Sequence, residues 1–305
     1  MSDYSNHIWY NSEIIPWEKA TTHVMSHVIH YGSGVFEGIK CYETSKGPAV
    51  FRLEDHIDRL FNSAKLYSMK IPFTKKEIIN GCVDIINANN LRNCYIRPIA
   101  FYGYDTLGVD PKECPLSVAI AAFYWGAYLG EDGVENGVNV TVSPYQKISP
   151  KAMPTTAKAS GQYMNSLLSV TEARSRGYDE AILLNVEGNI SEGSGQNIFY
   201  VKDGVVYTNN EESSILLGIT RDSIISICKN LDLPVSINSF SLNDLLNADE
   251  IFFTGTASEV TPVRSIDDTL IGNGEVGAIT SKLKSQYMDV VLGKDGDYSN
   301  WLSLI

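Results

Sequence analysis

The sequence predicts an α+β protein, and three observations lead to this prediction. Segments with strand character outnumber segments with helical periodicity, and they do not follow the regular strand–helix alternation of a parallel sheet. The chain has 305 residues, which suggests one large or two medium domains. A glycine-rich, acidic stretch at residues 126–136 is a candidate linker. We therefore expect a smaller N-terminal domain at residues 1–125 and a larger C-terminal domain at residues 137–305.

The N-terminal part mixes strands and helices. The turn residues "TSKG" separate two strand-like segments and predict a hairpin. Ile57, Leu60 and Ala64 recur at spacings of three and four, which is typical of one face of a helix. The expected elements are, in order, strands at 35–43 and 48–54, helices at 54–67 and 75–90, and strands at 94–104 and 115–126.

The C-terminal part contains the stronger turn and cap signals. Gly177 is placed to end a helix, and Asp203-Gly204 is a hairpin turn between two strand-like segments. A tight loop interrupts the strand-like residues 249–267. The expected elements are strands at 138–146, 180–193, 197–208 and 249–267, and helices at 162–177, 220–231 and 280–293.

Composition excludes several classes of protein. The net charge of -12 would repel nucleic acid and anionic lipid, and no run of basic residues offsets it. The N-terminus lacks the pattern of a signal peptide, and no apolar run is long enough to span a membrane. The five cysteines are scattered and form no CxxC pair, which favours reduced thiols in a cytoplasmic protein.

Two motifs resemble binding sites but are better explained as local structure. His23, His27 and His30 would share a helix face, as metal ligands do, but "YGSG" ends any helix at once and no fourth ligand is nearby. We therefore expect no metal site. "GNGEVG" at residues 272–277 matches a dinucleotide-binding string, but the strand before it is short and the rest of a nucleotide-binding unit is missing. A turn is the preferred interpretation.

Lys158 stands in unusual surroundings, within "TTAKASGQYMNS". Its neighbours are small or hydroxylated and offer no opposite charge. One interpretation is an exposed loop lysine, which is the commoner case. The other is a buried lysine that loses its proton readily and forms a Schiff base with a carbonyl compound.

Four further features favour the second interpretation of Lys158. Glu192 lies between glycines in "SEGSGQN" and could pair with a protonated ring nitrogen, although an exposed turn residue is the simpler explanation. Thr220, after Gly218, could cap a helix whose N-terminus binds phosphate. The loop Gly255–Ala257 could bind a second anion, and Arg59 could reach inward to a phosphate. Together these groups match what pyridoxal 5′-phosphate needs.

Taken in order along nearly the whole chain, the motifs resemble those of a branched-chain amino-acid aminotransferase, a class IV aminotransferase with pyridoxal-phosphate fold type IV. The resemblance implies a smaller N-terminal α/β domain and a larger C-terminal pseudo-barrel domain. The motifs that carry it are "HYGSGVFEGIKCY", "YIRP", "AAFYWGAYLG", "AKASGQYMNSLL", "EAILLNVEGNISEGSGQNIF", "LLGITRD" and "TGTASEVTPV".

The resemblance also implies a role for individual residues. Lys158 would form the Schiff base with the cofactor, Glu192 would pair with the pyridine nitrogen, and Tyr163 would lie near the phenolic oxygen. The residues that would hold the phosphate are Arg59, Ile219, Thr220 and Thr256. The residues that would bind the substrate are Tyr95 with Thr256 and Ala257 for the α-carboxylate, Tyr31, Phe36, Trp125 and Tyr128 for the apolar side chain, and Arg97 for the distal carboxylate of glutamate.

The implied reaction is a reversible ping-pong transfer of the amino group from L-leucine, L-isoleucine or L-valine to 2-oxoglutarate. A D-amino-acid or (R)-amine transaminase, or an aminodeoxychorismate lyase, remains an alternative on the same fold. A cofactor-free aldolase and a non-catalytic binding protein are alternatives of other classes. The family's active site borrows residues from a second subunit, so we expect a homodimer at least, with a trimer of dimers as the larger assembly.

Two residues depart from the family pattern. Gln196 stands where many relatives have a second glutamate in "SEGSGEN", and Lys40 replaces a frequent arginine. Both changes bear on tuning and substrate range, and neither removes a group that the chemistry requires.

Overall fold

The computed structural model describes residues 5–126 and 128–305, so residue 127 of the expected linker lies outside the described part. The chain forms two compact units. Unit 1 comprises Met1–Trp125, Ala157–Gln162 and Val290–Ile305, and unit 2 comprises Gly126–Thr156 and Tyr163–Asp289. The segments 157–162 and 290–305 therefore group with unit 1, whereas the sequence alone assigns them to the C-terminal domain. The division drawn from the sequence stays a prediction.

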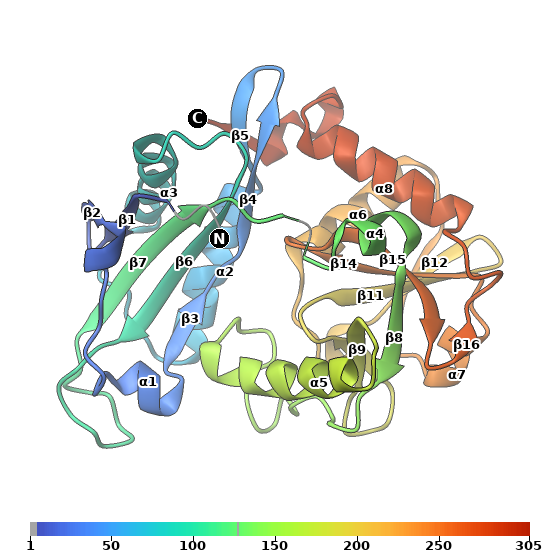
Figure 1. Cartoon of the computed structure of the whole chain (residues 1–305), viewed down its shortest axis with the longest axis horizontal. Helices are drawn as coiled ribbons and strands as arrows, with labels where there is room; N and C mark the ends of the chain where they lie inside the picture. The colour runs from blue at the N-terminus through green and yellow to red at the C-terminus, as the bar shows by residue number, and fades with distance from the viewer. Residues whose placement is uncertain (1–4, 127) are drawn as a thin grey trace. The chain divides into compact units, whose positions relative to one another are not determined.

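Unit 1 is built on an antiparallel sheet with the order β17-β5-β4-β6-β7-β1-β2, and β3 pairs with β6. β6 and β7 form its long centre (Figure 1). The strands are β1 (His7–Tyr10), β2 (Glu13–Pro16), β3 (Gly34–Phe36), β4 (Ile39–Thr44), β5 (Gly47–Phe51), β6 (Cys94–Tyr102), β7 (Leu116–Phe123) and β17 (Leu302–Leu304).

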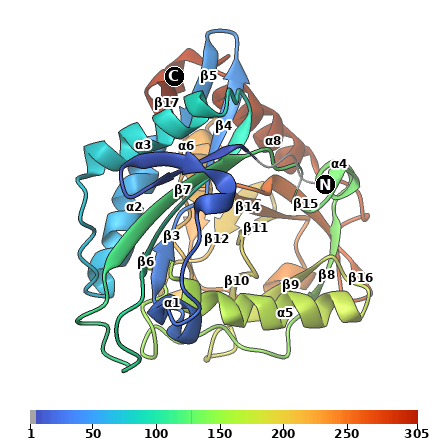
Figure 2. The same cartoon turned by 60° about the vertical axis from the view of Figure 1, so that its left-hand side comes forward.

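Two long helices, α2 and α3, pack against this sheet and against each other (Figure 2). Ile57 and Leu60 of α2 and Ile78 and Ile85 of α3 are fully buried, and each contributes roughly 1.5–3 kcal/mol relative to an exposed position. A capping box of Thr74 with Glu77 fixes the start of α3. The helical elements are η1 (Trp17–Lys19), α1 (His27–Tyr31), α2 (Leu53–Leu66), α3 (Lys75–Ala88), η2 (Ser160–Gln162) and η4 (Gly296–Trp301).

Unit 2 is built on a mixed sheet with the order β10-β9-β8-β15-β14-β11-β12-β13, and β16 pairs with β15. β8 runs parallel to both β9 and β15, and the long hairpin β14–β15 is antiparallel. The strands are β8 (Val138–Val142), β9 (Glu180–Leu184), β10 (Ile190–Gly193), β11 (Asn197–Lys202), β12 (Val205–Thr208), β13 (Val235–Ile237), β14 (Glu250–Gly255), β15 (Glu259–Ile266) and β16 (Thr269–Leu270).

The helices of unit 2 contact this sheet at different strands. α5 packs on β9 and β8, and α6 packs on β14 and β13. The helical elements are α4 (Glu131–Asn136), α5 (Tyr163–Ser175), η3 (Glu211–Ser213), α6 (Ile219–Asn230), α7 (Leu242–Leu246) and α8 (Ala278–Val291).

The α+β prediction is confirmed, and the five expected helices form within two residues of their predicted bounds. Asp203 and Gly204 both have positive φ and join β11 to β12, as predicted. One expectation is wrong. Thr220 is not the N-cap of α6, because Gly218 is the extended residue at that position and the helix begins at Ile219.

The expected linker also differs from its prediction, since residues 131–136 form the short helix α4, with Gly130 and Gly137 at its ends. Within the described residues, no helix has the length and apolar character that a membrane-spanning helix needs.

Candidate active site

Lys158 is held through its backbone by β3 and α2 in unit 1. Its N–H donates to the Ser63 hydroxyl at 3.0 Å, and its carbonyl accepts the N–H of Phe36 at 3.0 Å. The next residue, Ala159, forms a bridge with Val35. Because both backbone polar groups are satisfied by neighbouring elements, the position from which the Lys158 side chain starts is fixed.

The side chain of Lys158 is partly buried, and its Nζ atom lies 5.2 Å from the centre of the Phe36 ring. Its pKa is lowered from 10.5 to about 8, first by burial and then by the positive charge of Arg59, while Glu37 opposes the shift. Removing an ammonium group from water favours the neutral amine. A neutral amine of this kind can attack a carbonyl carbon.

Arg59 of α2 is held by the buried carboxylate of Glu37. Its Nε and Nη2 atoms donate to the two carboxylate oxygens at 2.7 and 2.8 Å. His56, one turn earlier on α2, donates from Nδ1 to Glu37 at 2.7 Å. Burial raises the pKa of Glu37, but the charge and hydrogen bonds of Arg59 outweigh it and hold that pKa well below its usual range. Glu37 is therefore an anion that fixes one edge of Arg59.

Arg97 of β6 lies among aromatic rings. Its guanidinium carbon is 4.9 Å from the ring centre of Phe36, 5.2 Å from that of Tyr95 and 6.0 Å from that of Trp125. Its Nη2 donates to the Tyr95 hydroxyl at 3.3 Å, whereas its buried Nε has no hydrogen-bond partner among the described residues. An apolar box with one unsatisfied guanidinium donor suits a ligand that is part apolar and part anionic.

Gly38 explains how Tyr95 reaches this position. A Cβ atom at residue 38 would lie 1.8 Å from the Tyr95 hydroxyl oxygen, so any larger residue would displace the ring. Tyr31 is placed differently, because its hydroxyl donates to the Leu107 carbonyl at 2.8 Å and its ring lies beside His27. Unit 1 thus groups Lys158, Arg59, Phe36, Tyr95, Arg97 and Trp125.

In unit 2, Glu192 is buried at the end of β10 and accepts three hydrogen bonds. Lys147 donates to Oε1 at 2.6 Å, and Asn197 and the N–H of Leu216 donate to Oε2 at 3.1 and 3.0 Å. The simpler explanation of an exposed turn residue is therefore wrong for Glu192, whose surface is 5% exposed. Fixed donors on both oxygens orient the carboxylate.

The N-terminus of α6 is the next candidate for an anion. Ile219 and Thr220 form its first turn, and no side chain of the described residues caps the helix. Asn197 connects this turn to Glu192, because its amide nitrogen also donates to the Leu216 carbonyl at 2.8 Å. A Cβ at Gly218 would lie 2.0 Å from the Asn197 Oδ1 atom, so this close packing requires glycine. Backbone N–H groups at such a helix start can bind phosphate.

The turn between β14 and β15 contains Thr256 and Ala257, both half-buried. Two buried hydroxyls flank it, Thr254 Oγ1 and Ser258 Oγ, and neither has a hydrogen-bond partner among the described residues. Buried hydroxyls without partners are costly, and a bound anion would satisfy them. This chemistry fits the phosphate or carboxylate that the sequence predicts here.

Tyr128 lies near the buried acid Glu180 and near Tyr163. Burial raises the pKa of Tyr128, as does the neighbouring charge of Glu180. Glu180 accepts the side-chain amide of Gln196 at 3.0 Å. Gln196, one of the two departures from the family pattern, is therefore a buried partner of this acid. The other, Lys40, places its amine 5.1 Å from the centre of the Tyr42 ring.

The histidines of the early motif are held by backbone groups. His27 contacts the carbonyls of Gly108 and Val109 and the Ser33 hydroxyl, and His30 contacts the Val24 carbonyl. Among the described residues, no group of three or more His, Cys, Asp or Glu side chains is arranged to bind a metal.

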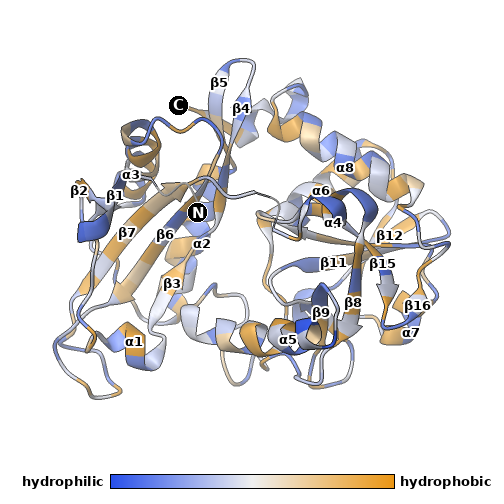
Figure 3. Ribbon diagram, viewed as in Figure 1, coloured by the Kyte–Doolittle hydropathy of each residue, from blue (hydrophilic) through white to orange (hydrophobic). Residues whose placement is uncertain are grey.

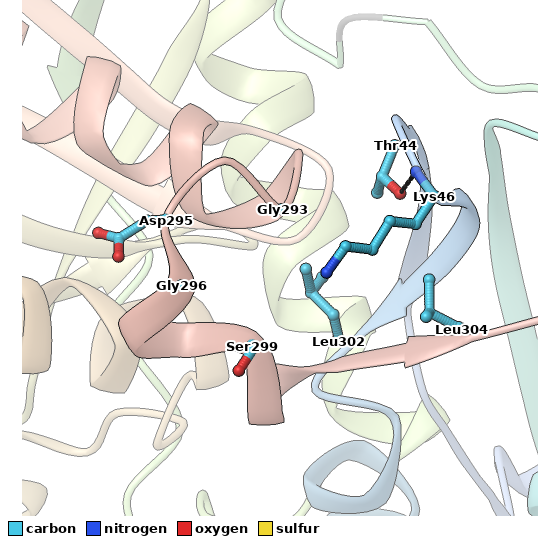
Figure 4. A pocket seen from close by; sticks show the side chains of 8 residues that line it. All are labelled: Thr44, Lys46, Gly293, Asp295, Gly296, Ser299, Leu302 and Leu304. Atoms are coloured by element: carbon cyan, nitrogen blue, oxygen red, sulfur yellow. Dashed lines mark hydrogen bonds between the residues drawn. The ribbon is translucent and has the colours of Figure 1, made fainter.

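A small cavity of about 130 Å³ lies where the β4–β5 turn meets the C-terminal residues of unit 1 (Figure 4). Lys46 extends over it towards Leu302, and the backbone of Lys46 donates to the Thr44 hydroxyl at 3.1 Å. Its described lining residues include no residue that the sequence predicts for the site.

Sequence reasoning missed four residues that hold the predicted ones in place, namely Glu37, His56, Lys147 and Asn197. For Glu37 and His56, the spacing of His56 and Arg59 on one predicted helix is a usable sequence signal. Lys147 and Asn197 had none, because they meet Glu192 only through the folding of β8, β10 and β11.

Comparison with known proteins gives consistent results. The model of the family "Amino-transferase class IV" matches residues 34–266. The branched-chain-amino-acid aminotransferase of Escherichia coli strain K12 is 45% identical over 302 residues, which cover 99% of this chain and 98% of that protein.

Comparison with solved structures points to the same family. A crystal structure of the branched-chain amino acid aminotransferase of Escherichia coli has a TM-score of 0.96 at 46% identity and covers 98% of this chain and 99% of that one. The structure of the branched-chain amino acid aminotransferase of Thermobaculum terrenum in its pyridoxal-phosphate form has a TM-score of 0.92 at 35% identity, with 99% of this chain and 98% of that one covered.

Proposed function

The chain belongs to the class IV aminotransferases, and from this membership we propose that it is a pyridoxal 5′-phosphate-dependent branched-chain-amino-acid aminotransferase. It transfers the amino group of L-leucine, L-isoleucine or L-valine to 2-oxoglutarate, which gives a branched 2-oxo acid and L-glutamate. The observation that carries the proposal is the partly buried Lys158, whose pKa is about 8, beside the aromatic box around Arg97.

The groups on the chain fit the cofactor. The phosphate is assigned to Arg59, to the first turn of α6 with Ile219 and Thr220, and to the turn at Thr256. Glu192 is a buried, oriented carboxylate suited to a protonated ring nitrogen, and Tyr163 is assigned to the phenolic oxygen. When bound, the cofactor supplies an electron sink for the pair left behind when the substrate loses its Cα proton.

Lys158 has two tasks in this proposal. Its Nζ atom would hold the cofactor. Its amine, once free, would act as the base that moves the proton of the substrate Cα atom. A pKa of about 8 suits both tasks, because a catalytic base works best when its pKa lies near the working pH.

The box of unit 1 explains how one pocket accepts leucine and glutamate in turn. Phe36 and Trp125 of this box are assigned to the apolar side chain, together with Tyr31 and Tyr128, which are not part of the box. Each buried methylene is worth about 0.8 kcal/mol. Arg97 is assigned to the distal carboxylate of glutamate. Its unsatisfied Nε supports this role, because a carboxylate would satisfy it. The α-carboxylate is assigned to Tyr95 with Thr256 and Ala257.

We also propose a cytoplasmic enzyme that is at least a homodimer. Five buried, free cysteines support a reducing compartment. The helix α5 carries apolar stretches (Figure 3), and its Met164, Leu167 and Leu168 are 60%, 54% and 44% exposed. Such side chains on one helix favour contact with a second copy of the chain.

A substrate panel tests the assignment. The purified protein is given 2-oxoglutarate together with L-leucine, D-alanine or an (R)-configured amine, and L-glutamate or D-glutamate is measured. We expect L-glutamate from L-leucine at a rate at least about tenfold above the others. A preference for D-alanine or for the amine would overturn the branched-chain assignment while leaving the family membership intact.

A further inference from the structure

Glu37 and His56 are buried ionisable residues to which the proposed reaction gives no task. Glu37 has no exposed surface and His56 is 1% exposed. Burying a carboxylate is costly unless it is paired and hydrogen-bonded, so its place beside Arg59 calls for a reason. Both residues lie in unit 1, next to the segment that carries Lys158.

The contacts form a chain that ends at Arg59. His56 donates to Glu37 at 2.7 Å, and Glu37 receives Nε and Nη2 of Arg59 at 2.7 and 2.8 Å. The N–H of Gly38 adds a contact to the same carboxylate at 3.2 Å. The backbone N–H of Glu37 donates to the Pro98 carbonyl at 2.8 Å, which ties the residue to β6.

Helix geometry explains why these groups meet. His56, Arg59 and Ser63 stand at spacings of three and four on α2, so they share one face. That face meets Glu37 through His56 and Arg59, and it meets Lys158 through Ser63. One face of α2 thus positions both Arg59 and the segment that contains Lys158.

Resting on the proposed function, we propose that Glu37 and His56 are positioning residues that aim Arg59 at the phosphate of the cofactor. A carboxylate that accepts from Nε and Nη2 fixes the plane of the guanidinium and therefore the direction in which its other N–H groups point. His56 holds the carboxylate at the correct rotation. Burial lowers the pKa of His56, so the ring is neutral and leaves the charge of the Glu37–Arg59 pair balanced.

Phosphate selectivity separates positioning from a merely structural role. The apoprotein is titrated with pyridoxal 5′-phosphate and, separately, with pyridoxal, which lacks the phosphate, and the ratio of the two dissociation constants is taken. Loss of general folding weakens both ligands together, whereas a misaimed Arg59 weakens the phosphorylated ligand alone.

Glu37→Gln is the main variant, because it keeps the shape of the side chain and removes its charge. We expect the preference for the phosphorylated ligand to fall by about tenfold, as for other partners that orient a ligand-binding group. Glu43→Gln is the matched control. Glu43 also faces Nε and Nη2 of an arginine, Arg92, but this pair is exposed, so the preference should stay at its wild-type value.

His56→Asn and His56→Leu decide the matter if Glu37→Gln does not fold. An asparagine amide can donate where Nδ1 does, so the preference should stay within about twofold of wild type, whereas leucine cannot donate and should lower it about tenfold. If the ratio of the two dissociation constants is the same in every variant as in the wild type, the positioning role is overturned. A wild-type protein that binds both ligands equally would instead overturn the proposed function, and this inference with it.

Discussion

Unit 1 and unit 2 use buried ion pairs in opposite senses. In unit 1 the acid supports the cation, because Glu37 is fully buried and holds Arg59, which is 14% exposed. In unit 2 the cation supports the acid, because Lys147 donates to Glu192, whose other oxygen is held by Asn197 and Leu216. Each unit fixes one charged group with a partner of opposite sign.

The difference matches the two kinds of charge that the proposed cofactor and substrates carry. Phosphate and carboxylate groups are anions and need oriented cations such as Arg59 and Arg97. A protonated ring nitrogen is a cation and needs an oriented anion such as Glu192. Removing the charge of a group that meets the cofactor or the substrate should therefore have a larger effect than changing a residue that only adjusts the surroundings of such a group.

The largest effect is expected for Glu192→Gln. An amide cannot hold the ring nitrogen in its protonated form, so the electron sink weakens, and Lys147 loses its partner. We expect kcat with L-leucine to fall by about a hundredfold. Glu187→Gln, at an exposed turn nearby, is the control and should leave kcat unchanged. A Glu192→Gln enzyme with near wild-type kcat would contradict the role given to this acid.

Arg97→Met should separate the two substrates. The variant keeps apolar bulk and removes the guanidinium, so L-glutamate loses a charged hydrogen bond worth about 1.5–3 kcal/mol. We expect kcat/KM for L-glutamate to fall by roughly 10- to 100-fold, and that for L-leucine to change by less than about threefold. Equal losses for both amino acids would show that Arg97 does not discriminate; Arg92→Met, at an exposed pair, serves as control.

Lys158 should make the stability of the apoprotein depend on pH. Its folded pKa of about 8 lies below the ordinary value of 10.5, so between these values the unfolded chain binds a proton that the folded chain does not. The free energy of unfolding should therefore rise with pH across this window, and Lys158→Met should remove that contribution.

Urea unfolding of the apoprotein at pH 8 and pH 10 measures the effect as the difference between wild type and Lys158→Met. Lys151→Met, which changes an exposed lysine, should behave as wild type. If the free energy of unfolding changes equally with pH in Lys158→Met and in the wild type, burial does not destabilise the charged form of the Lys158 amine.

Gln196→Glu should have the smallest effect. It places a second carboxyl about 3.0 Å from Glu180, so one of the two must hold a proton and its pKa rises. Stability that depends on this proton is present at low pH and lost as the pH rises through the raised pKa. We expect the variant to lose more Tm at pH 8 than at pH 5, and Gln146→Glu, at an exposed site, to show no such difference.

The helices were predictable because their apolar residues recur at helical spacing, as Ile57, Leu60 and Ala64 do. The place of Lys158 was not, since residues 157–162 pack in unit 1 through contacts with Phe36 and Ser63, which lie far away in the sequence. The N-cap of α6 was misassigned because Thr220 has the better intrinsic preference, whereas packing against Asn197 requires glycine at residue 218.

The chemical groups of the site were predictable as residue types, but their supporting partners were not. From the sequence alone, an exposed turn residue is the simpler explanation of Glu192. The structure shows Lys147 and Asn197 donating to its carboxylate, and these contacts form only when β8, β10 and β11 pack together. The partners of Glu37 were not predictable either, because nothing in the strand-like segment that contains it indicates which residues it contacts. Counterions that meet through tertiary packing leave no periodic signal.

The most direct measurement is the visible absorption of the purified protein loaded with pyridoxal 5′-phosphate. We predict a yellow protein whose band disappears when L-leucine is added without an acceptor and returns when 2-oxoglutarate follows, and we predict no such cycle for Lys158→Ala. A wild-type protein that stays colourless and takes up no cofactor, or whose band L-leucine leaves unchanged, would contradict the proposed aminotransferase activity.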